Sequence, residues 1–306
     1  MSLQVVLRLT TFLLPFLVGA HVRLLQPKPY GPNTVNWHDP MTPEMFPCKH
    51  TYDGTDPTAM KTGDTQPLTF HSDDTATHGG GSCQLSISKN MSPNSSVDFR
   101  VFKSFIGECP ASFTAEPHVV TPRDDMTFKI PKSIPNGDAI FAWTWTSCKT
   151  NEFFMSCAPV TISGGAEDTT EFNTLPNIIV ANLDEICRPN TTGNYTPVYP
   201  TQNQGPDPTL NHTDIAQQFN VVMLDMPAAC TSAFPRSGSS NSSGSSGSSG
   251  ATPTPTPSTS PCSSPQDGFM CHPTLHFYGT CQNSNVTWIL YGDGHSCTNG
   301  KGLDVP

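Results

Sequence analysis

Two histidines of this chain, His21 and His78, are the residues best suited to hold a metal ion. Cleavage after Ala20 would make His21 the amino terminus of the mature chain. A terminal histidine offers a metal both its α-amine and a ring nitrogen, which no internal histidine can do. The expected cleavage therefore creates a metal ligand.

Residues 1–20 have the pattern that predicts this cleavage. They carry one cation, Arg8, then an apolar run over residues 9–18, and small residues stand before the junction. This pattern is typical of a secretory signal peptide. The alternative is a membrane anchor, but the run is roughly half of the ~20 apolar residues needed to span a bilayer. No later segment is long and apolar enough, so we expect a secreted, extracellular chain with no membrane partner.

His78 precedes a run of three glycines, Gly79 to Gly81, and Cys83 follows them closely. Glycines allow the backbone to turn sharply and to approach another element, and a disulfide from Cys83 would tie the loop to the core. Most of the 10 histidines of a secreted protein are surface or hydrogen-bonded residues. The histidine expected at the mature terminus strengthens the hypothesis that His78 is a ligand.

The run from Glu152 to Cys157 places a carboxylate beside an aromatic ring. In a strand, Glu152 and Phe154 share one face, whereas Phe153, Met155 and Cys157 share the other. The second set indicates core packing and a disulfide. The first set is a candidate functional pair, and the alternative is an exposed glutamate beside a half-buried phenylalanine.

Short runs rich in β-branched and aromatic residues are the elements expected to position these groups. No long stretch repeats apolar residues at helical spacing. We therefore predict an all-β fold, an antiparallel β-sandwich of the immunoglobulin or fibronectin kind with long loops. The segment from Gly31 to Thr65 is expected to be irregular, with Cys48 as its staple. The expected strands are Pro67 to Phe70, Cys83 to Ser88, Asp98 to Phe105, Met126 to Ile130, Ala139 to Thr146, Glu152 to Ile162 and Asn177 to Asn182.

Composition divides the rest of the chain. We expect one β-sandwich domain over residues 21–230 and a Ser-, Gly-, Thr- and Pro-rich linker over 231–261. Residues 262–306 are too few for a large core, which predicts a small module stapled by disulfides.

The 11 cysteines indicate an oxidising compartment. A net charge of −10 with only 15 Lys and Arg excludes nucleic acid as a partner. Sequons for N-glycosylation begin at Asn90, Asn94, Asn190, Asn194, Asn211, Asn241 and Asn285.

Short motifs between residues 21 and 187 follow one another in a specific order and spacing. They are Leu25-Gln26-Pro27-Lys28-Pro29-Tyr30-Gly31 after His21, Phe46-Pro47-Cys48-Lys49, the run from Ala76 to Gln84, Ala142-Trp143-Thr144-Trp145 and Met155-Ser156-Cys157-Ala158-Pro159. As a set they resemble the fungal chitin-active lytic polysaccharide monooxygenases of auxiliary-activity family eleven.

The resemblance implies one mononuclear copper ion held by the α-amine and ring of His21 and by the ring of His78, a nitrogen set that suits copper. It implies oxidative cleavage of insoluble chitin with an external electron donor and dioxygen or peroxide. Glu152 matches a family glutamate that positions an oxygen species or a water, and Ala76 matches a small residue on one axial side. Phe154 stands where the family usually has tyrosine, so it has no oxygen to approach the metal.

The first domain holds an odd number of cysteines. Cys148 has no counterpart in the family pattern and is the expected unpaired thiol. The sequence does not fix the connectivity of the other six, and we expect the pairs Cys48–Cys157, Cys83–Cys109 and Cys187–Cys230.

The residues after 262 resemble small cysteine-stapled chitin-binding modules of fungal enzymes. Exposed aromatic rings stack on sugar faces, and the candidates are Phe277, Tyr278, Trp288 and Tyr291. The alternative is that some of these rings form the core of the module.

Three alternatives to a chitin-cleaving enzyme remain at this level. One is activity on cellulose-like glucans, another is a copper-binding or cell-wall protein without turnover, and the third is a structural wall protein that needs neither histidine. We expect the protein to be a monomer.

Overall fold

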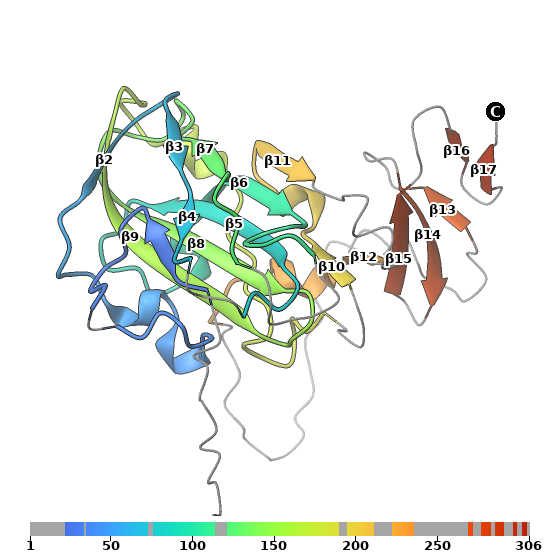
Figure 1. The fold of residues 1–306 in the computed structure, drawn as a ribbon. Coiled ribbons are helices and arrows are strands. Elements are labelled where there is room, and N and C mark those ends of the chain that lie inside the picture. Colours follow the sequence, from blue (N-terminus) through green and yellow to red (C-terminus); the bar gives the residue numbers. More distant parts are fainter. Residues whose placement is uncertain are drawn as a thin grey trace, which may run out of the picture.

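The computed structural model describes residues 22–33, 35–72, 76–113, 121–189, 195–210 and 222–235, and the strands β13 to β17 between residues 269 and 304. His21, the expected signal peptide and most of the expected linker lie outside these residues. Within them the structure consists of strands and short 3-10 turns, and no helix has the length and apolar character needed to cross a membrane. The prediction of an all-β fold is confirmed (Figure 1).

A six-stranded sheet forms the centre of the domain, in the order β11-β6-β5-β8-β9-β2. The inner strands are antiparallel, whereas the two edge strands run parallel to their neighbours. The strands are β2 (Thr58–Lys61), β5 (Gly81–Ser88), β6 (Arg100–Ile106), β8 (Gly137–Ser147), β9 (Phe153–Ser163) and β11 (Asp207–Leu210).

Both faces of this sheet are buried under further layers. On one face lie two strand pairs, β1 (Leu24–Gln26) with β4 (Thr69–Phe70) and β3 (Thr65–Pro67) with β7 (Thr127–Lys129). The other face is covered by strand β10 (Tyr195–Val198), irregular segments and short turns. These turns and those elsewhere are η1 (Pro43–Met45), η2 (Cys48–His50), η3 (Ser96–Asp98), η4 (Phe172–Thr174), η5 (Thr201–Asn203) and η6 (Ala228–Thr231).

The two apolar clusters of the core lie on opposite sides of β9. Phe153, Met155 and Cys157 belong to one cluster, and Phe154 and Ala158 belong to the other. The alternation expected for this strand is present, but both of its faces are core. Phe154 is therefore buried, and the alternative of a half-buried phenylalanine does not hold.

Two of the expected strands differ in the structure, one because it is divided and the other because it is absent. The run Pro67 to Phe70 is divided at Leu68 between β3 and β4, because the two pieces pair with different partners. Residues 178–181 are buried but form no strand. The backbone N–H of Ile179 donates to the side chain of Gln84 at 2.8 Å, and Val101 donates to the carbonyl of Pro176 at 2.7 Å. This apolar run fills the core without joining a ladder.

The segment from Gly31 to Thr65 is largely irregular, as expected, with one exception. Its residues 58–61 form edge strand β2, which pairs with β9. The segment also packs into the core through Trp37, Met41 and Phe46, each 5% exposed or less. The segment is therefore an integral part of the domain and not an exposed surface loop.

Three disulfides fasten these layers, in the pairs expected from the sequence. Cys48–Cys157 ties the irregular segment to β9, Cys83–Cys109 ties β5 to the turn after β6, and Cys187–Cys230 ties η6 to the core. Cys148 is the one free cysteine among the described residues between 22 and 235.

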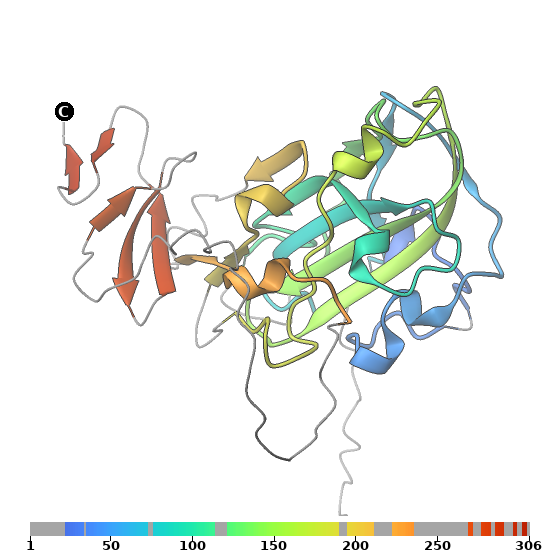
Figure 2. The same ribbon diagram turned by 180° about the vertical axis from the view of Figure 1, so that it is seen from behind.

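Phe234, in the first residues of the segment expected to be linker, packs against the domain. The ring of Phe234 meets the ring of Phe46 edge-on, with centroids 5.1 Å apart. The carbonyl of Phe234 also accepts a hydrogen bond of 2.7 Å from the backbone N–H of Ser96. Figure 2 shows the orange segment that carries η6 on the same side as the turns near residue 45 and residue 97.

A second sheet joins the domain to the C-terminal strands, in the order β10-β12-β15-β14-β13. Strand β12 pairs with β10 on one side and with β15 on the other, where Met223 lies opposite Trp288. The strands are β10 (Tyr195–Val198), β12 (Val222–Asp225), β13 (Phe269–Cys271), β14 (Phe277–Gln282) and β15 (Asn285–Leu290), and the separate pair β16 (Ser296–Thr298) and β17 (Gly302–Asp304) follows.

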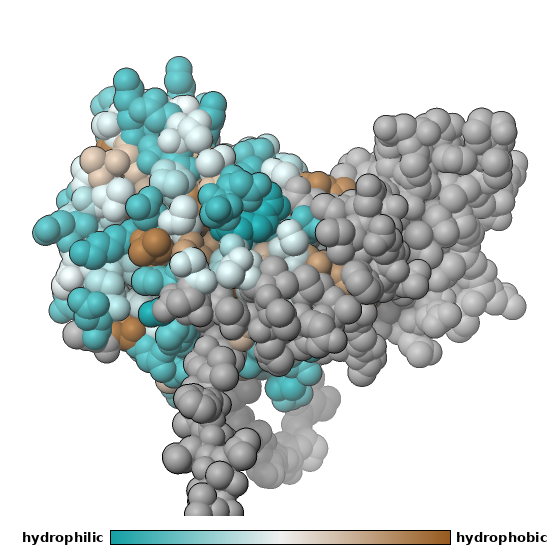
Figure 3. Space-filling model, viewed as in Figure 1, coloured by the Kyte–Doolittle hydropathy of each residue, from teal (hydrophilic) through white to brown (hydrophobic). Residues whose placement is uncertain are grey.

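Large apolar side chains are dispersed on the described surface. Those more than a third exposed are Leu25, Met45, Met91, Val97 and Ile186. The face seen in Figure 3 is mostly hydrophilic where it is coloured, with isolated brown residues. Single exposed apolar residues are normal and indicate no docking site.

Candidate metal centre

His78 lies on a left-handed turn that leads into β5. The backbone φ is 47° at His78, 69° at Gly79 and 83° at Gly80. This conformation costs a residue with a Cβ about 1–2 kcal/mol. The turn is closed by a 2.7 Å hydrogen bond from the N–H of Gly80 to the carbonyl of Thr77. The surroundings must therefore hold His78 in a conformation that the chain alone disfavours.

The glycine run after His78 is anchored to β8. The carbonyl of Gly80 accepts from the backbone N–H of Cys148 at 3.1 Å and from the indole Nε1 of Trp145 at 3.3 Å. The carbonyl of Gly81 accepts from the N–H of Cys109 at 3.3 Å. Together with the disulfide from Cys83, these bonds fix the main chain of the turn.

Gly80 is expected to tolerate no side chain. A Cβ at this position would lie 2.4 Å from the carbonyl oxygen of Ala111. We expect Gly80→Ala to lower the free energy of unfolding by at least about 2 kcal/mol, from the left-handed conformation and the overlap together. Chemical denaturation measures the change.

Gly63 supplies the matched control. It has the same φ of +83°, and a Cβ at this position would have nothing within 4 Å. Gly63→Ala should therefore show the conformational cost alone, about 1 kcal/mol. Equal losses in the two variants would mean that the turn can move away from Ala111.

The ring of His78 rests on a stack of aromatic side chains. Its centroid lies 5.8 Å from that of Trp145 and 6.3 Å from that of Phe154, with interplanar angles of 20° and 23°. Trp145 and Phe154 stack on each other at 4.5 Å and are paired in the β8–β9 ladder. Trp143 continues the stack at 6.2 Å from Trp145. This packing fixes the plane of the imidazole.

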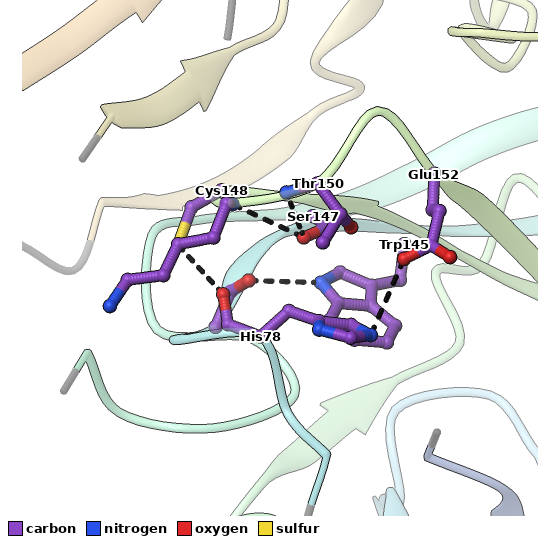
Figure 4. A network of polar contacts seen from close by, with 8 residues as sticks. His78, Trp145, Ser147, Cys148, Thr150 and Glu152 are labelled. Atoms are coloured by element: carbon purple, nitrogen blue, oxygen red, sulfur yellow. Dashed lines mark hydrogen bonds and ion pairs between the residues drawn. The ribbon is translucent and has the colours of Figure 1, made fainter. Parts of the chain in front are cut away.

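The carboxylate of Glu152 faces the outer edge of this imidazole. Its Oε2 lies 3.3 Å from Nε2 of His78, and the two side chains are 29% and 7% exposed. Figure 4 shows the carboxylate reaching the ring from the turn between β8 and β9. Glu152 thus has access to solvent, while His78 is nearly enclosed.

The same turn contributes a thiol on the other side of His78. Sγ of Cys148 lies 3.2 Å from the carbonyl oxygen of His78 and 3.0 Å from that of Gly79. Burial raises the pKa of this thiol to about 12, so it stays protonated near neutral pH. The sequence identified Cys148 as unpaired but did not reveal this contact.

The structure brings some of the expected site residues together, and others lie outside the described residues. Glu152 and Phe154 lie at His78, and Ala76 is buried two residues before it. His21 lies outside the described residues, but Val22, which follows it, belongs to the same core cluster as Trp145 and Phe154. For Phe277, Tyr278 and Trp288 only the strands are described, and Tyr291 lies outside the description.

Trp145 is a site residue that sequence reasoning missed as such. It lies two residues after Trp143 on β8, and both indoles are fully buried. The ladder partner of Trp145 on β5 is Cys83, which is close in sequence to His78. This pairing is what places Trp145 beside His78. It could be predicted only if the neighbouring strands and their register were already known.

The donor chemistry around His78 fits copper. Imidazole nitrogen suits this metal, and Nε2 of His78 faces a carboxylate at 3.3 Å and not a main-chain carbonyl. Among the described residues no group of three or more His, Cys, Asp or Glu side chains could hold a metal. His21, the other expected ligand, lies outside these residues.

Comparison with known proteins shows similarity to one family. The chain is 35% identical over 163 residues to an AA11 family lytic polysaccharide monooxygenase of Aspergillus oryzae, a match that covers 50% of this chain and 38% of that protein. It is 39% identical over 147 residues to AA11 family lytic polysaccharide monooxygenase A of Aspergillus fumigatus, covering 46% and 59%. The matches thus span less than two thirds of these relatives. No model of a known protein family matches the chain.

Solved structures give weaker likenesses. A cellulose-active polysaccharide monooxygenase from M. thermophila aligns with a TM-score of 0.33 and 17% identity, over 43% of this chain and 66% of that one. A Bacillus amyloliquefaciens CBM33 protein in complex with Cu(I) aligns with a TM-score of 0.27 and 20% identity, over 38% and 61%. Scores at this level support no inference about the site.

Proposed function

We propose that this chain is a secreted, copper-dependent lytic polysaccharide monooxygenase that cleaves glycosidic bonds in chitin oxidatively. The observation that carries the proposal is the fixed pair of His78 and Glu152, in a chain similar to AA11 family enzymes over half its length. An external electron donor and dioxygen or hydrogen peroxide complete the reaction. The mature chain would begin at His21 and act as a monomer.

Copper would be held by the α-amine and ring of His21 and by Nε2 of His78. When bound, it supplies the one-electron chemistry by which O₂ or H₂O₂ oxidises a C–H bond next to the glycosidic oxygen. The chain's contribution is to fix the geometry. The aromatic stack sets the plane of the His78 ring, and the left-handed turn sets its direction.

Glu152 is the acid–base group of the proposed site. Its carboxylate lies at the solvent side of His78, where it can accept a hydrogen bond from a water or hold a proton during turnover. Ala76, with its small side chain, would leave room at the metal.

Phe154 packs against the ring of His78 and has no oxygen that could approach a metal. Its ring is 1% exposed and lies against Trp145, so it excludes water beneath His78. A tyrosine at this position would carry a hydroxyl toward the metal. This feature also favours the second candidate function, a copper-binding protein that no longer oxidises sugar.

One experiment separates these functions. Mature protein beginning at His21 is loaded with one equivalent of copper and incubated with chitin and ascorbate, and the soluble products are analysed by mass spectrometry. Oxidised chito-oligosaccharides that require both copper and ascorbate support the enzyme. Oxidised products from a parallel incubation with cellulose, and none from chitin, would identify a cellulose-like glucan as the substrate. Tight copper binding without oxidised products from either would support the copper-binding role.

The C-terminal residues 262–306 are proposed to bind polysaccharide through Phe277, Tyr278, Trp288 and Tyr291. A linked binding segment raises the local concentration of an enzyme at an insoluble surface. Removal of these residues should lower the fraction bound to chitin, with an apparent dissociation constant at least about tenfold higher. A depletion isotherm measures the change.

Copper affinity is the control for this truncation. It should stay within about twofold of the full chain, because His78 and Glu152 lie in turns next to β5 and β9 of the central sheet, whose order includes none of the C-terminal strands. Unchanged chitin binding would show that the C-terminal residues have another role.

A further inference from the structure

The turn between β8 and β9 contacts His78 in two places. Glu152, at the end of the turn, reaches the imidazole at 3.3 Å, and Cys148, at its start, reaches the main-chain carbonyl of His78 at 3.2 Å. Figure 4 shows the two contacts on opposite sides of the histidine. One turn thus touches both the ring and the backbone of the same residue.

Cys148 contacts the backbone of the left-handed turn through both its main chain and its side chain. Its N–H donates to the carbonyl of Gly80 at 3.1 Å, and its thiol lies 3.0 Å from the carbonyl of Gly79. A Cβ on Gly79 would stand 3.3 Å from Sγ, a tight contact, and 2.8 Å from Cε of Lys149, so the backbone here is closely packed against residues 148 and 149. The side chain is 1% exposed.

These contacts involve every residue whose φ is positive between His78 and Gly80. The single S–H lies within hydrogen-bond distance of the carbonyls of the first two, and the N–H of Cys148 donates to the third. Hydrogen bonds made in a buried site hold a strained backbone more firmly than solvent does. Cys148 is therefore placed to stabilise the conformation that directs His78.

We infer that Cys148 is a positioning residue that fixes His78 relative to Glu152 by hydrogen-bonding the His78–Gly79 main chain. This inference rests on the proposed function, because it assigns the cysteine a role at the proposed copper site. Cys148 acts through His78 and touches neither metal nor substrate in this role. It would also explain why a seventh cysteine stands in a domain with three disulfides.

The first test uses the metal-free mature protein, so it does not depend on copper or activity. In Cys148→Ala, amide hydrogen exchange of the peptide that covers His78 to Gly80 should become about tenfold faster, the effect of losing one buried hydrogen bond. Cys148→Ser retains a donor and should restore most of the protection. Val160→Ala, a buried change at the distant part of β9, controls for general loss of stability and should leave this peptide unchanged.

The second test uses copper-loaded protein and electron paramagnetic resonance. Cys148→Ala should shift the Cu(II) spectrum, and Cys148→Ser should return it toward the parent, while Val160→Ala should not move it. A double-mutant cycle with Glu152→Gln in kcat/KM should be non-additive, because both changes act on the same pair.

Unchanged exchange and an unchanged spectrum in Cys148→Ala would overturn the inference. A serine variant that behaves like the alanine variant would overturn it too, because the effect would then come from packing. If the parent protein binds no copper, the proposed function fails, and the exchange experiment still decides whether Cys148 holds the turn.

Discussion

Replacing His78 by alanine is expected to weaken copper binding at least about 100-fold and to abolish oxidation of chitin. The change removes the one imidazole that the described residues direct at the site, and the donors of His21 alone would remain. The ring of His78 lies on Trp145 with its Nε2 toward Glu152, so no neighbouring side chain can take its place without rebuilding the turn.

Titration calorimetry of metal-free mature protein measures this loss. His50→Ala is the matched control, because His50 is an exposed histidine whose ring nitrogen bonds to the carbonyl of Glu44 at 2.8 Å. The control should bind copper like the parent. A His78→Ala protein that binds copper as tightly as the parent would exclude the proposed centre and favour a structural wall protein.

Replacing Glu152 by glutamine is expected to lower the rate of chitin oxidation about 100-fold while copper affinity changes by about threefold or less. The amide has nearly the same size as the carboxylate but cannot take up a proton. Because Glu152 touches His78 at its edge and is 29% exposed, its loss should affect turnover more than metal binding.

Initial rates of product release and calorimetry on the same samples separate the two effects. Glu185→Gln controls for the loss of one negative charge, since Glu185 is 85% exposed and paired with Arg188 on the surface. Equal rates in the Glu152→Gln variant and the parent would remove Glu152 from the reaction and leave it a structural contact of His78.

The central strands were the part of the fold most accessible to sequence reasoning. The expected run Ala139 to Thr146 lies within β8, and Glu152 to Ile162 overlaps β9 except at its first residue. These strands are long, apolar and bounded by turn residues. The edge strands β2 and β11 were missed, because short parallel edge strands carry polar residues and proline and show no alternation.

The error at residues 177–182 has a different physical cause. An apolar run shows that side chains are buried, but it does not show whether the backbone joins a ladder. Here Asn177 makes a single bridge with Arg100 at the start of β6, β11 pairs with the rest of that strand, and Gln84 satisfies the N–H of Ile179. Burial and strand pairing are separate properties, and only the first is visible in composition.

The sequence by itself determined which chemical groups this protein has: the imidazole of His78, its glycine run, the carboxylate of Glu152 and an odd cysteine. It also determined which residues share a face of a strand, because side chains alternate with a period of two. Only the tertiary structure decided that Cys148 and Glu152 both reach His78, from positions about 70 residues away. The reason is that strand neighbours and register are set by packing of β5, β8 and β9 across the whole core, which no local pattern encodes.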